Sequence, residues 1–152
     1  MMYMEGMIIM KFNLSECIGF ITNTTMKFVS EDFNRRLEAK GSTRIQWIAL
    51  YFLNEENKSI SQKELATLMN IKDSSLARLV DRMERDGLIN RVENPKDKRV
   101  KFLELTNDGR NKIEILLPEG KYFSDLLLED ITEEELVTFY RVLDKMSNNI
   151  KK

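Results

Sequence analysis

The chain of 152 residues is long enough for one well-packed core and too short for two ordinary domains. Its 42% apolar and 32% charged residues are typical of a globular protein and not of a disordered one. It contains no histidine and a single cysteine, Cys17, which excludes histidine-based catalysis, an intrachain disulfide and zinc sites built from cysteine and histidine. We therefore expect no enzyme activity, no metal and no cofactor.

We expect no targeting signal among the N-terminal residues. The first ten include five methionines but no lysine or arginine, and the apolar run from Met7 to Met10 is short. A signal peptide needs a basic start and a longer apolar segment, and no stretch approaches the ~20 apolar residues of a membrane span. We expect a soluble cytoplasmic protein without membrane contact. Because residues 1–9 show no pattern of their own, Met10 is a candidate initiator.

Two helices are predicted in the first third of the chain. Asn13, with Glu16 three residues later, resembles an N-cap followed by a capping-box acid and predicts a long helix from Leu14 to about Ala39. Gly41 is suited to ending this helix. Thr43 is expected to cap a second helix. The apolar residues of that second helix are Trp47, Leu50, Tyr51 and Leu53.

A helix-turn-helix pattern follows the polar loop Asn54–Lys58. Ser61 and Glu64 form a second capping box, and the turn Asn70–Lys72 leads into a helix that ends at Gly87. An apolar face of that helix, at spacings i, i+3, i+4 and i+7, consists of Leu76, Leu79, Val80 and Met83. A separate polar face carries Ser75, Arg78, Arg82 and Arg85. Such a helix can point its N-terminal end at DNA bases while its arginines contact phosphates.

A β-hairpin with a basic tip is predicted next. The β-prone runs Leu88–Glu93 and Val100–Leu105 are joined by the turn-forming sequence Asn94–Lys98, in which Pro95 suits a free sheet edge. Nine basic and six acidic side chains lie between residues 72 and 101, whereas the whole chain has a net charge of −1. Positive charge is therefore concentrated on the segment that would hold a DNA-reading helix and a wing beside it.

The C-terminal third is predicted to be helical. Thr106 is expected to cap a helix that is interrupted or kinked at Pro118–Gly120, and Thr132 with Glu135 forms a third capping box. The apolar residues of the last helix are Leu136, Phe139, Tyr140, Leu143, Met146 and Ile150. Long amphipathic helices at both ends have few partners within one small chain, so we expect a twofold dimer.

These patterns together predict a mainly α fold with a small β-hairpin wing. We expect a single domain over residues 1–152, with a winged helix-turn-helix lobe over about 43–112 and a helical dimerisation region over about 13–40 and 113–152. In a twofold dimer the two recognition helices would lie one DNA turn apart, ~34–36 Å, over a palindromic site.

Several motifs resemble the multiple antibiotic resistance regulator (MarR) family. They are Gln62–Ala66, Ser74–Glu84, Gly87–Ile89, Asp97–Arg99, Leu105–Thr106, Gly109, Gln46–Trp47 and Thr132–Glu135. The resemblance covers nearly all of the chain after about residue 13. It implies a bacterial, homodimeric winged-helix transcription factor that binds double-stranded DNA, most often a repressor released by a small ligand or by oxidation.

The resemblance also implies roles for individual residues. Ser74, Ser75 and Arg78 would face the major groove, and Arg99, oriented by Asp97, would enter the minor groove. A guanidinium is weakly hydrated and suits a narrow, strongly negative groove. Asp97 and Arg99 can also simply pin the hairpin turn, and both roles can hold together. The residues expected to contact phosphates are Arg82, Arg85, Lys96 and Lys98.

A small aromatic or lipophilic effector is a further implication, because members of this family keep a ligand cleft between the dimer helices and the DNA-binding lobe. The candidate lining residues are Phe20, Phe28, Trp47 and Tyr51, with Arg44 as a possible clamp for a carboxylate. Aromatic side chains at helical spacing are also typical of a plain core.

Two alternatives differ in class from a ligand-controlled repressor. A thiol-based redox sensor would use Cys17, but in the peroxide-sensing branch of the family the sensing cysteine would fall at Gly19, and the expected tyrosine positions hold Phe33 and Arg44. A low thiol pKa needs polar or cationic neighbours, and Cys17 is surrounded by apolar residues in the sequence. A winged-helix module for protein–protein contact would instead use the basic face to bind an acidic partner.

Overall fold

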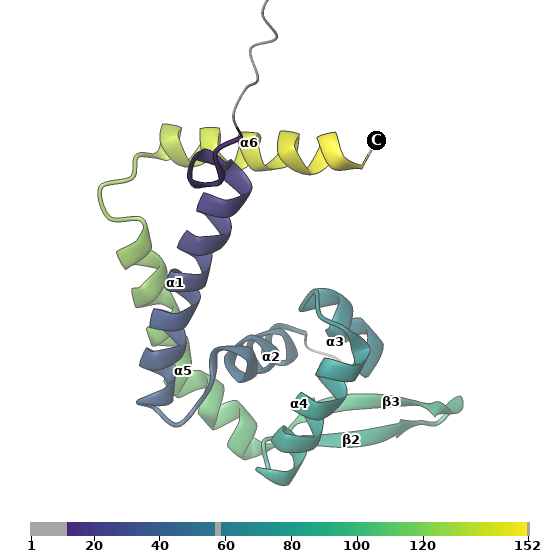
Figure 1. Ribbon diagram of the computed structural model, residues 1–152. Helices are drawn as coiled ribbons and strands as arrows, with labels where there is room; N and C mark the ends of the chain where they lie inside the picture. The colour runs from purple at the N-terminus through teal and green to yellow at the C-terminus, as the bar shows by residue number, and fades with distance from the viewer. Residues whose placement is uncertain (1–11, 57–58, 152) are drawn as a thin grey trace, which may run out of the picture.

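The chain folds into two connected parts, a winged-helix lobe and a group of long helices from its two ends (Figure 1). The computed structural model describes residues 12–56 and 59–151. Six α-helices and three short strands within these ranges confirm a mainly α fold with a small wing. The candidate initiator Met10 and the end of the expected loop Asn54–Lys58 lie outside the described residues.

The first long helix begins later than the capping pattern predicted. Asn13 caps a one-turn 3-10 helix, η1 (Leu14–Glu16), and Cys17 then has extended backbone (φ −70°, ψ 117°) before α1 (Ile18–Glu38) begins. The prediction of a continuous helix from Leu14 was wrong at this end. The Asn13 side-chain amide donates to Glu16 Oε1 at 2.7 Å. Glu16 thus bonds the side chain of Asn13, whereas a capping box would use the backbone N–H of that residue. At the other end, Gly41 (φ 70°) follows α1 as predicted.

Three helices build the lobe, and local chemistry explains where they begin. Thr43 accepts a hydrogen bond from the Gln46 amide and begins α2 (Arg44–Glu55). A complete capping box between Ser61 and Glu64 begins α3 (Gln62–Leu68), as predicted. After a turn in which Asn70 has a positive φ of 50°, α4 (Asp73–Arg85) starts without a side-chain cap.

The wing is part of a three-stranded antiparallel sheet and not an isolated hairpin. β2 (Ile89–Asn94) pairs with β3 (Asp97–Leu105), and β1 (Ile60–Ser61) pairs with the other edge of β3, which gives the order β1-β3-β2. The sequence did not predict β1, because two residues between a loop and a helix are too few to show an alternating pattern. This extra strand fixes the start of α3 to the wing.

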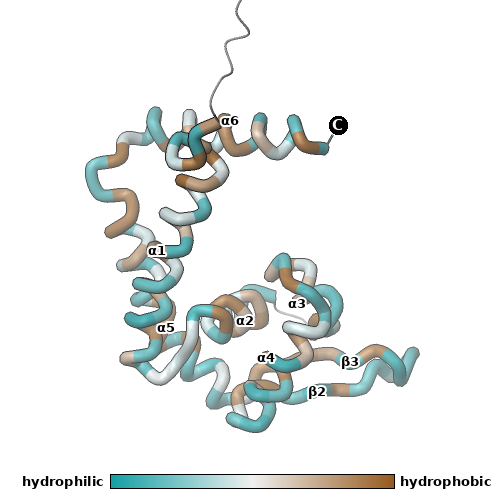
Figure 2. The backbone as a smooth tube through the Cα atoms, viewed as in Figure 1, coloured by the Kyte–Doolittle hydropathy of each residue, from teal (hydrophilic) through white to brown (hydrophobic). Residues whose placement is uncertain are grey.

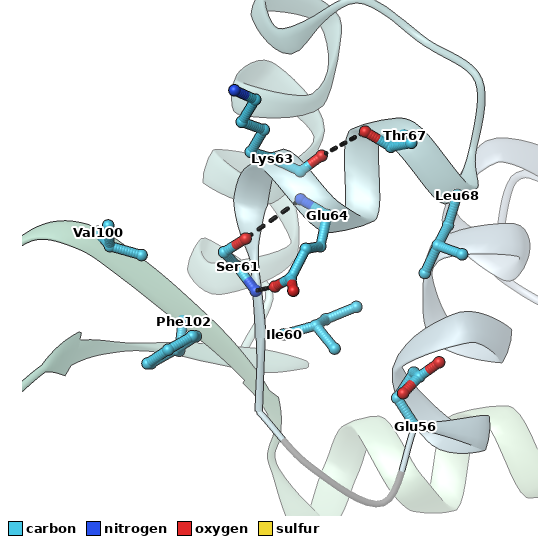
Figure 3. Close-up of a pocket in the computed structure, with 9 residues that line it drawn as sticks. All are labelled: Glu56, Ile60, Ser61, Lys63, Glu64, Thr67, Leu68, Val100 and Phe102. Atoms are coloured by element: carbon cyan, nitrogen blue, oxygen red, sulfur yellow. Dashed lines mark hydrogen bonds between the residues drawn. The ribbon is translucent and has the colours of Figure 1, made fainter.

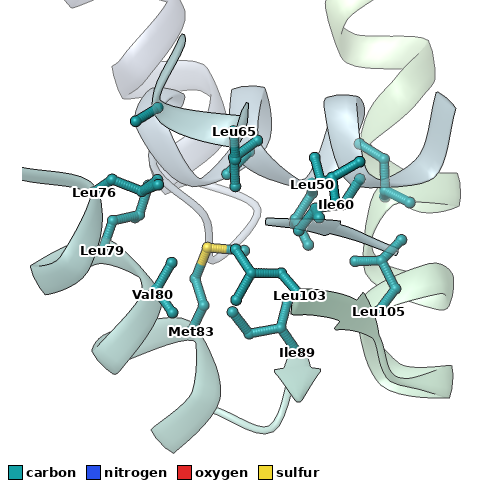
Figure 4. Close-up of a cluster of buried hydrophobic side chains, with 14 residues drawn as sticks. Leu50, Ile60, Leu65, Leu76, Leu79, Val80, Met83, Ile89, Leu103 and Leu105 are labelled. Atoms are coloured by element: carbon teal, nitrogen blue, oxygen red, sulfur yellow. The ribbon is translucent and has the colours of Figure 1, made fainter. Parts of the chain in front are cut away.

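One apolar core joins the helices of the lobe to the sheet (Figure 4). The apolar face predicted for α4 is buried in it and meets Leu50 from α2, Leu65 from α3 and Leu103 from β3. Each such side chain contributes roughly 1.5–3 kcal/mol relative to an exposed position. Burial of this face fixes how α4 is rotated and therefore which residues it presents to solvent.

The helix α5 (Asn107–Leu127) connects the lobe to the helical part. It runs without interruption through Pro118, so the predicted interruption was wrong, whereas the alternative of a kink stays a prediction. The loss of one N–H donor is outweighed where α5 packs against α2. The indole N–H of Trp47 on α2 donates to the Leu116 carbonyl at 3.1 Å. At Gly120 a Cβ atom would lie 2.3 Å from the Trp47 ring, so only glycine permits this contact.

The helical part leaves many apolar side chains exposed along α1, α5 and α6 (Glu133–Ile150). Figure 2 shows hydrophobic positions distributed along these helices. No residue of α6, all of which the structure describes, is buried. Across residues 12–56 and 59–151, no helix has the length and apolarity needed to cross a bilayer. The exposed apolar residues of α1 and α6 are Ile18, Phe20, Ile21, Met26, Phe28, Val137, Phe139, Tyr140, Val142, Leu143 and Ile150.

Candidate nucleic-acid interface

The first turns of α4 present the small hydroxyls and the arginine that the sequence nominated. Ser74, Ser75 and Arg78 are all exposed, because the opposite face of the helix is buried in the core. Early backbone N–H groups of a helix point along its axis and lack intrahelical partners, so this end attracts anions. Hydroxyls beside an arginine add hydrogen-bond donors and acceptors at the same place.

The other arginines of α4 continue this exposed surface. Arg78 and Arg82 have no acidic partner among the residues that the structure describes, and Arg85 Nε lies 3.7 Å from Asp86 Oδ1. Two acids of the same helix, Asp81 and Glu84, pair with Arg91 on β2 and not with these arginines. The surface therefore carries free positive charge.

The tip of the wing holds one strongly exposed arginine in a fixed direction. The Arg99 side chain is 91% exposed, and its Nε and Nη2 donate to the two carboxylate oxygens of Asp97 at 3.0 and 3.1 Å. The backbone N–H of Arg99 also donates to Asp97 Oδ1 at 3.0 Å. The Arg99 guanidinium, and then its backbone N–H, lower the pKa of Asp97 from its ordinary value. The remaining nominated residues of the tip, Lys96 and Lys98, are exposed.

Arg91 is a residue of this region that the sequence reasoning did not single out. Its guanidinium donates to the carboxylates of Asp81 and Glu84 on α4, and its Nε donates to Gln62 Oε1 at 3.2 Å. Burial opposes the charged form of Arg91, but these two carboxylates outweigh it and raise the pKa of the guanidinium. A signal was present in the sequence: alternation along β2 puts residue 91 on the same face as buried Ile89, where a charge needs partners.

The five residues expected to bind a ligand are not gathered at one place. Trp47 and Tyr51 stack with ring centres 5.6 Å apart, whereas Phe20 and Phe28 on α1 are 46% and 72% exposed. Arg44 lines a separate hollow of about 340 Å³ beside α1. The Trp47–Tyr51 pair lies where α2 packs against the long helices, and Arg44 also meets α1 there, because its backbone N–H donates to Asn34 Oδ1 at 2.8 Å.

A different groove, of about 590 Å³, lies between α3 and the wing (Figure 3). Its walls combine apolar residues, among them Leu68 on α3 and Phe102 on β3, with polar and charged residues such as Lys63. None of the five nominated ligand residues lines it. In the part of the chain that is described, no group of acidic or cysteine side chains is arranged to hold a metal ion, and Cys17 is half-buried and unbridged.

The fold and this exposed basic surface define the winged helix-turn-helix class of protein. A family model described as "MarR family" matches residues 40–100. The HTH-type transcriptional repressor MdtR of Bacillus subtilis (strain 168) is 33% identical over 111 residues, which cover 73% of this chain and 71% of that protein. The chain therefore belongs to the MarR family of transcriptional regulators, which are not enzymes.

Two further likenesses agree with this assignment. An uncharacterized HTH-type transcriptional regulator of Bacillus subtilis (strain 168), YdgJ, is 31% identical over 71% of this chain, which spans 64% of that relative's length. The crystal structure of the S. aureus MepR–DNA complex superposes with a TM-score of 0.82 at 21% identity, and covers 88% of this chain and 98% of that one. This second likeness concerns the fold.

Proposed function

We propose that the protein is a homodimeric, sequence-specific DNA-binding regulator that represses transcription by occupying a palindromic operator. The observation that carries this proposal is the combination of unpaired arginines on the exposed face of α4 with an exposed wing-tip arginine held by Asp97. A repressor role is supported by the likeness to MdtR, which is named as a repressor, and DNA binding by the fold shared with MepR, whose structure contains DNA.

Within this proposal the interface residues divide into two groups. Ser74, Ser75 and Arg78 read base edges in the major groove, because they occupy the exposed N-terminal half of α4. Arg99 enters the adjacent minor groove, since Asp97 leaves the outer edge of its guanidinium free. The phosphate contacts, which set affinity and salt dependence, come from Arg82, Arg85, Lys96 and Lys98.

The second copy of the chain covers the apolar faces of the end helices. Exposed apolar residues on α1 and α6 are too numerous for a monomer that remains in solution at ordinary concentrations. A hollow of about 640 Å³ on α6, lined in part by Phe139 and Val142, offers a place for side chains of the partner. Twofold pairing would set two copies of α4 on successive turns of one DNA face.

An effector, where one acts, binds at the junction of the two parts. The stacked pair Trp47–Tyr51 on α2 supports this, because α2 packs against α1 and α5 and also belongs to the core of the lobe. A small aromatic or lipophilic molecule that inserted beside these rings would change the angle between the lobe and the dimer helices. It releases DNA if it prefers a dimer whose α4 helices are spaced wrongly for successive grooves.

The deciding experiment is fluorescence anisotropy of the purified protein on the duplex upstream of its own gene, against a scrambled duplex, across a salt series. We expect binding to the native duplex to be ~10³-fold tighter or more. Arg78→Ala should weaken binding to the native duplex, whereas Lys121→Ala, which removes an exposed charge from α5, should not.

Equal and weak binding to both duplexes, followed by failure to select any preferred sequence from random DNA, would overturn the proposal. That outcome would favour the alternative in which the basic face of the lobe binds an acidic protein. Peroxide-dependent release of DNA that Cys17→Ser abolishes would instead establish the redox alternative for the release step.

A further inference from the structure

Arg91 joins three elements beside the proposed DNA-reading surface. Its backbone N–H donates to Glu84 Oε1 at 3.2 Å, and its guanidinium donates to Glu84 Oε2, to Asp81 Oδ1 and to the Gln62 side chain. Glu84 and Asp81 belong to α4, Gln62 begins α3, and Arg91 itself lies on β2. A single side chain therefore ties the wing to both helices of the helix-turn-helix.

Asp81 is placed where it would otherwise compete for the DNA-facing arginines. It follows Arg78 by three residues and precedes Arg85 by four, and both spacings bring oppositely charged side chains together on a helix surface. In the structure Asp81 is paired with Arg91, and Arg78 has no acidic partner among the described residues. Pairing with Arg91 therefore keeps Asp81 from neutralising the DNA-facing arginines.

We propose that Arg91 is a positioning residue for DNA binding, which holds Asp81 and Glu84 against the base of the wing and so keeps Asp81 from pairing with Arg78 or Arg85. This inference rests on the proposed role of α4 at the operator. Arg91 does not itself contact DNA, because its side chain is 24% exposed and its donor groups are turned toward α3 and α4.

Two consequences separate this role from a purely structural one. Loss of Arg91 releases Asp81 to pair with Arg78 or Arg85, and it leaves two negative charges beside the phosphates. Neutralising Asp81 removes the competitor without replacing the lost tie between β2 and α4. Affinity for DNA should therefore recover in the double variant even though the tie between wing and helices stays broken.

The test uses the full-length protein and anisotropy on the operator duplex, with variants Arg91→Met, Asp81→Asn and the two combined. Methionine keeps an unbranched apolar stem where arginine packs its own. We expect Arg91→Met to weaken binding about tenfold, from unmasked charge near the DNA. Asp81→Asn alone should leave the affinity unchanged, and the double variant should return to within about threefold of the parent protein.

Failure of the double variant to recover would overturn the inference. If the double variant does not recover and the slope of log affinity against log salt concentration is lower by about one, Arg91 contacts a phosphate directly. Recovery that fails with an unchanged slope would show a structural role alone. If Arg78→Ala leaves affinity unchanged, the proposed interface itself is wrong, which is distinguishable from failure of the Arg91 inference alone.

Folding of the variants is checked by thermal unfolding before binding is measured. Should Arg91→Met not fold, Arg91→Lys takes its place in the same two backgrounds. Lysine keeps the positive charge, but its single ammonium lacks the planar fork that reaches both carboxylates and Gln62. If Arg91→Lys lowers operator affinity by less and Asp81→Asn again restores it, the inference is supported. If Asp81→Asn does not restore the affinity, the inference is overturned.

Discussion

At the scale of single residues, exposure decides what an arginine of the wing can do. Arg99 and Arg91 belong to neighbouring strands, and each is paired with carboxylate. Asp97 holds Arg99 from one side and leaves the rest in solvent, whereas Arg91 faces the helices and is held from several sides. The first can reach another molecule, and the second acts within the lobe.

Substitution Arg99→Ala tests the role of the wing tip. We expect operator affinity to fall about tenfold or more, as for an arginine that contacts DNA, while the melting temperature stays nearly unchanged because the side chain is exposed. Anisotropy and thermal unfolding on the same preparation measure the two effects. Intact binding with a large loss of stability would show that Asp97 and Arg99 only pin the turn.

The absence of histidine predicts a flat pH response of DNA binding. No side chain with an ordinary pKa near 6.5 is present in the chain. Arg99 lowers the pKa of Asp97 from its ordinary 3.8. The contribution of this pair to the stability of the wing tip is therefore complete above about that pH and is lost only as the pH falls further. Operator affinity at fixed ionic strength should therefore be constant from about pH 5.5 to 7. A marked change of operator affinity within that window would contradict the prediction, because it would require a titrating group other than Asp97.

Whether the sequence predicted the partners of each arginine depended on how far away in the chain those partners lie. Asp97 and Arg99 lie two positions apart, so their pairing was readable from a local motif. Arg91 depends on Gln62, which is 29 residues away, and on two acids of α4 whose directions were set only when the helix was buried. The sequence showed the local pair directly, whereas for Arg91 it indicated only that a charge on the buried face of β2 needs partners, and packing decided which residues they are.

At the scale of elements, side-chain caps predicted helix starts well. Thr43, Ser61, Thr106 and Thr132 all accept the hydrogen bonds that the sequence indicated. At Asn13 the error was local, because its side-chain amide donates to Glu16, three residues later. The other two errors share a cause: β1 exists only because β3 pairs with it, and α5 continues through Pro118 against α2. In each of these, a contact outside the local window decided the outcome.

The start of α5 offers a sharp test of element packing. A Cβ atom at Gly109 would lie 2.0 Å from the Leu88 carbonyl oxygen, a backbone atom that cannot rotate away. Gly109→Ala should therefore force the helix and the sheet apart and destabilise the protein by about 1–3 kcal/mol. Denaturant unfolding measures this, and the exposed Asn111→Ala on the same helix is the matched control. Equal stability of the two variants would mean that the start of α5 does not approach Leu88 this closely.

At the scale of the whole molecule, one helix relates the two parts to each other. α5 begins against the sheet and ends in the helical part, and α2 packs along it through the Trp47–Leu116 hydrogen bond. Phe33 on α1 meets the Trp47 ring edge-on at 5.2 Å and stacks on Phe123 of α5 at 4.6 Å. This aromatic cluster sets the angle at which the lobe leaves the long helices, and in the proposed dimer that angle fixes the spacing of the two α4 helices.

The proposed dimer is tested on α6. Phe139 is 47% exposed and lines the apolar hollow of that helix, so Phe139→Glu should place a charge in the interface and yield a monomer. Asn148→Glu adds the same charge nine residues later, on the opposite side of a helix with 3.6 residues per turn, and should stay dimeric.

Sedimentation and operator anisotropy together read out this pair of variants. A monomer engages one half-site at a time and loses the gain from linked binding, so we expect its affinity to fall by about a hundredfold or more. The lobe itself should melt as before, because no residue of α6 enters its core. A dimeric Phe139→Glu variant with full affinity would place the interface elsewhere, and a monomer with full affinity would show that the operator does not require two copies of α4.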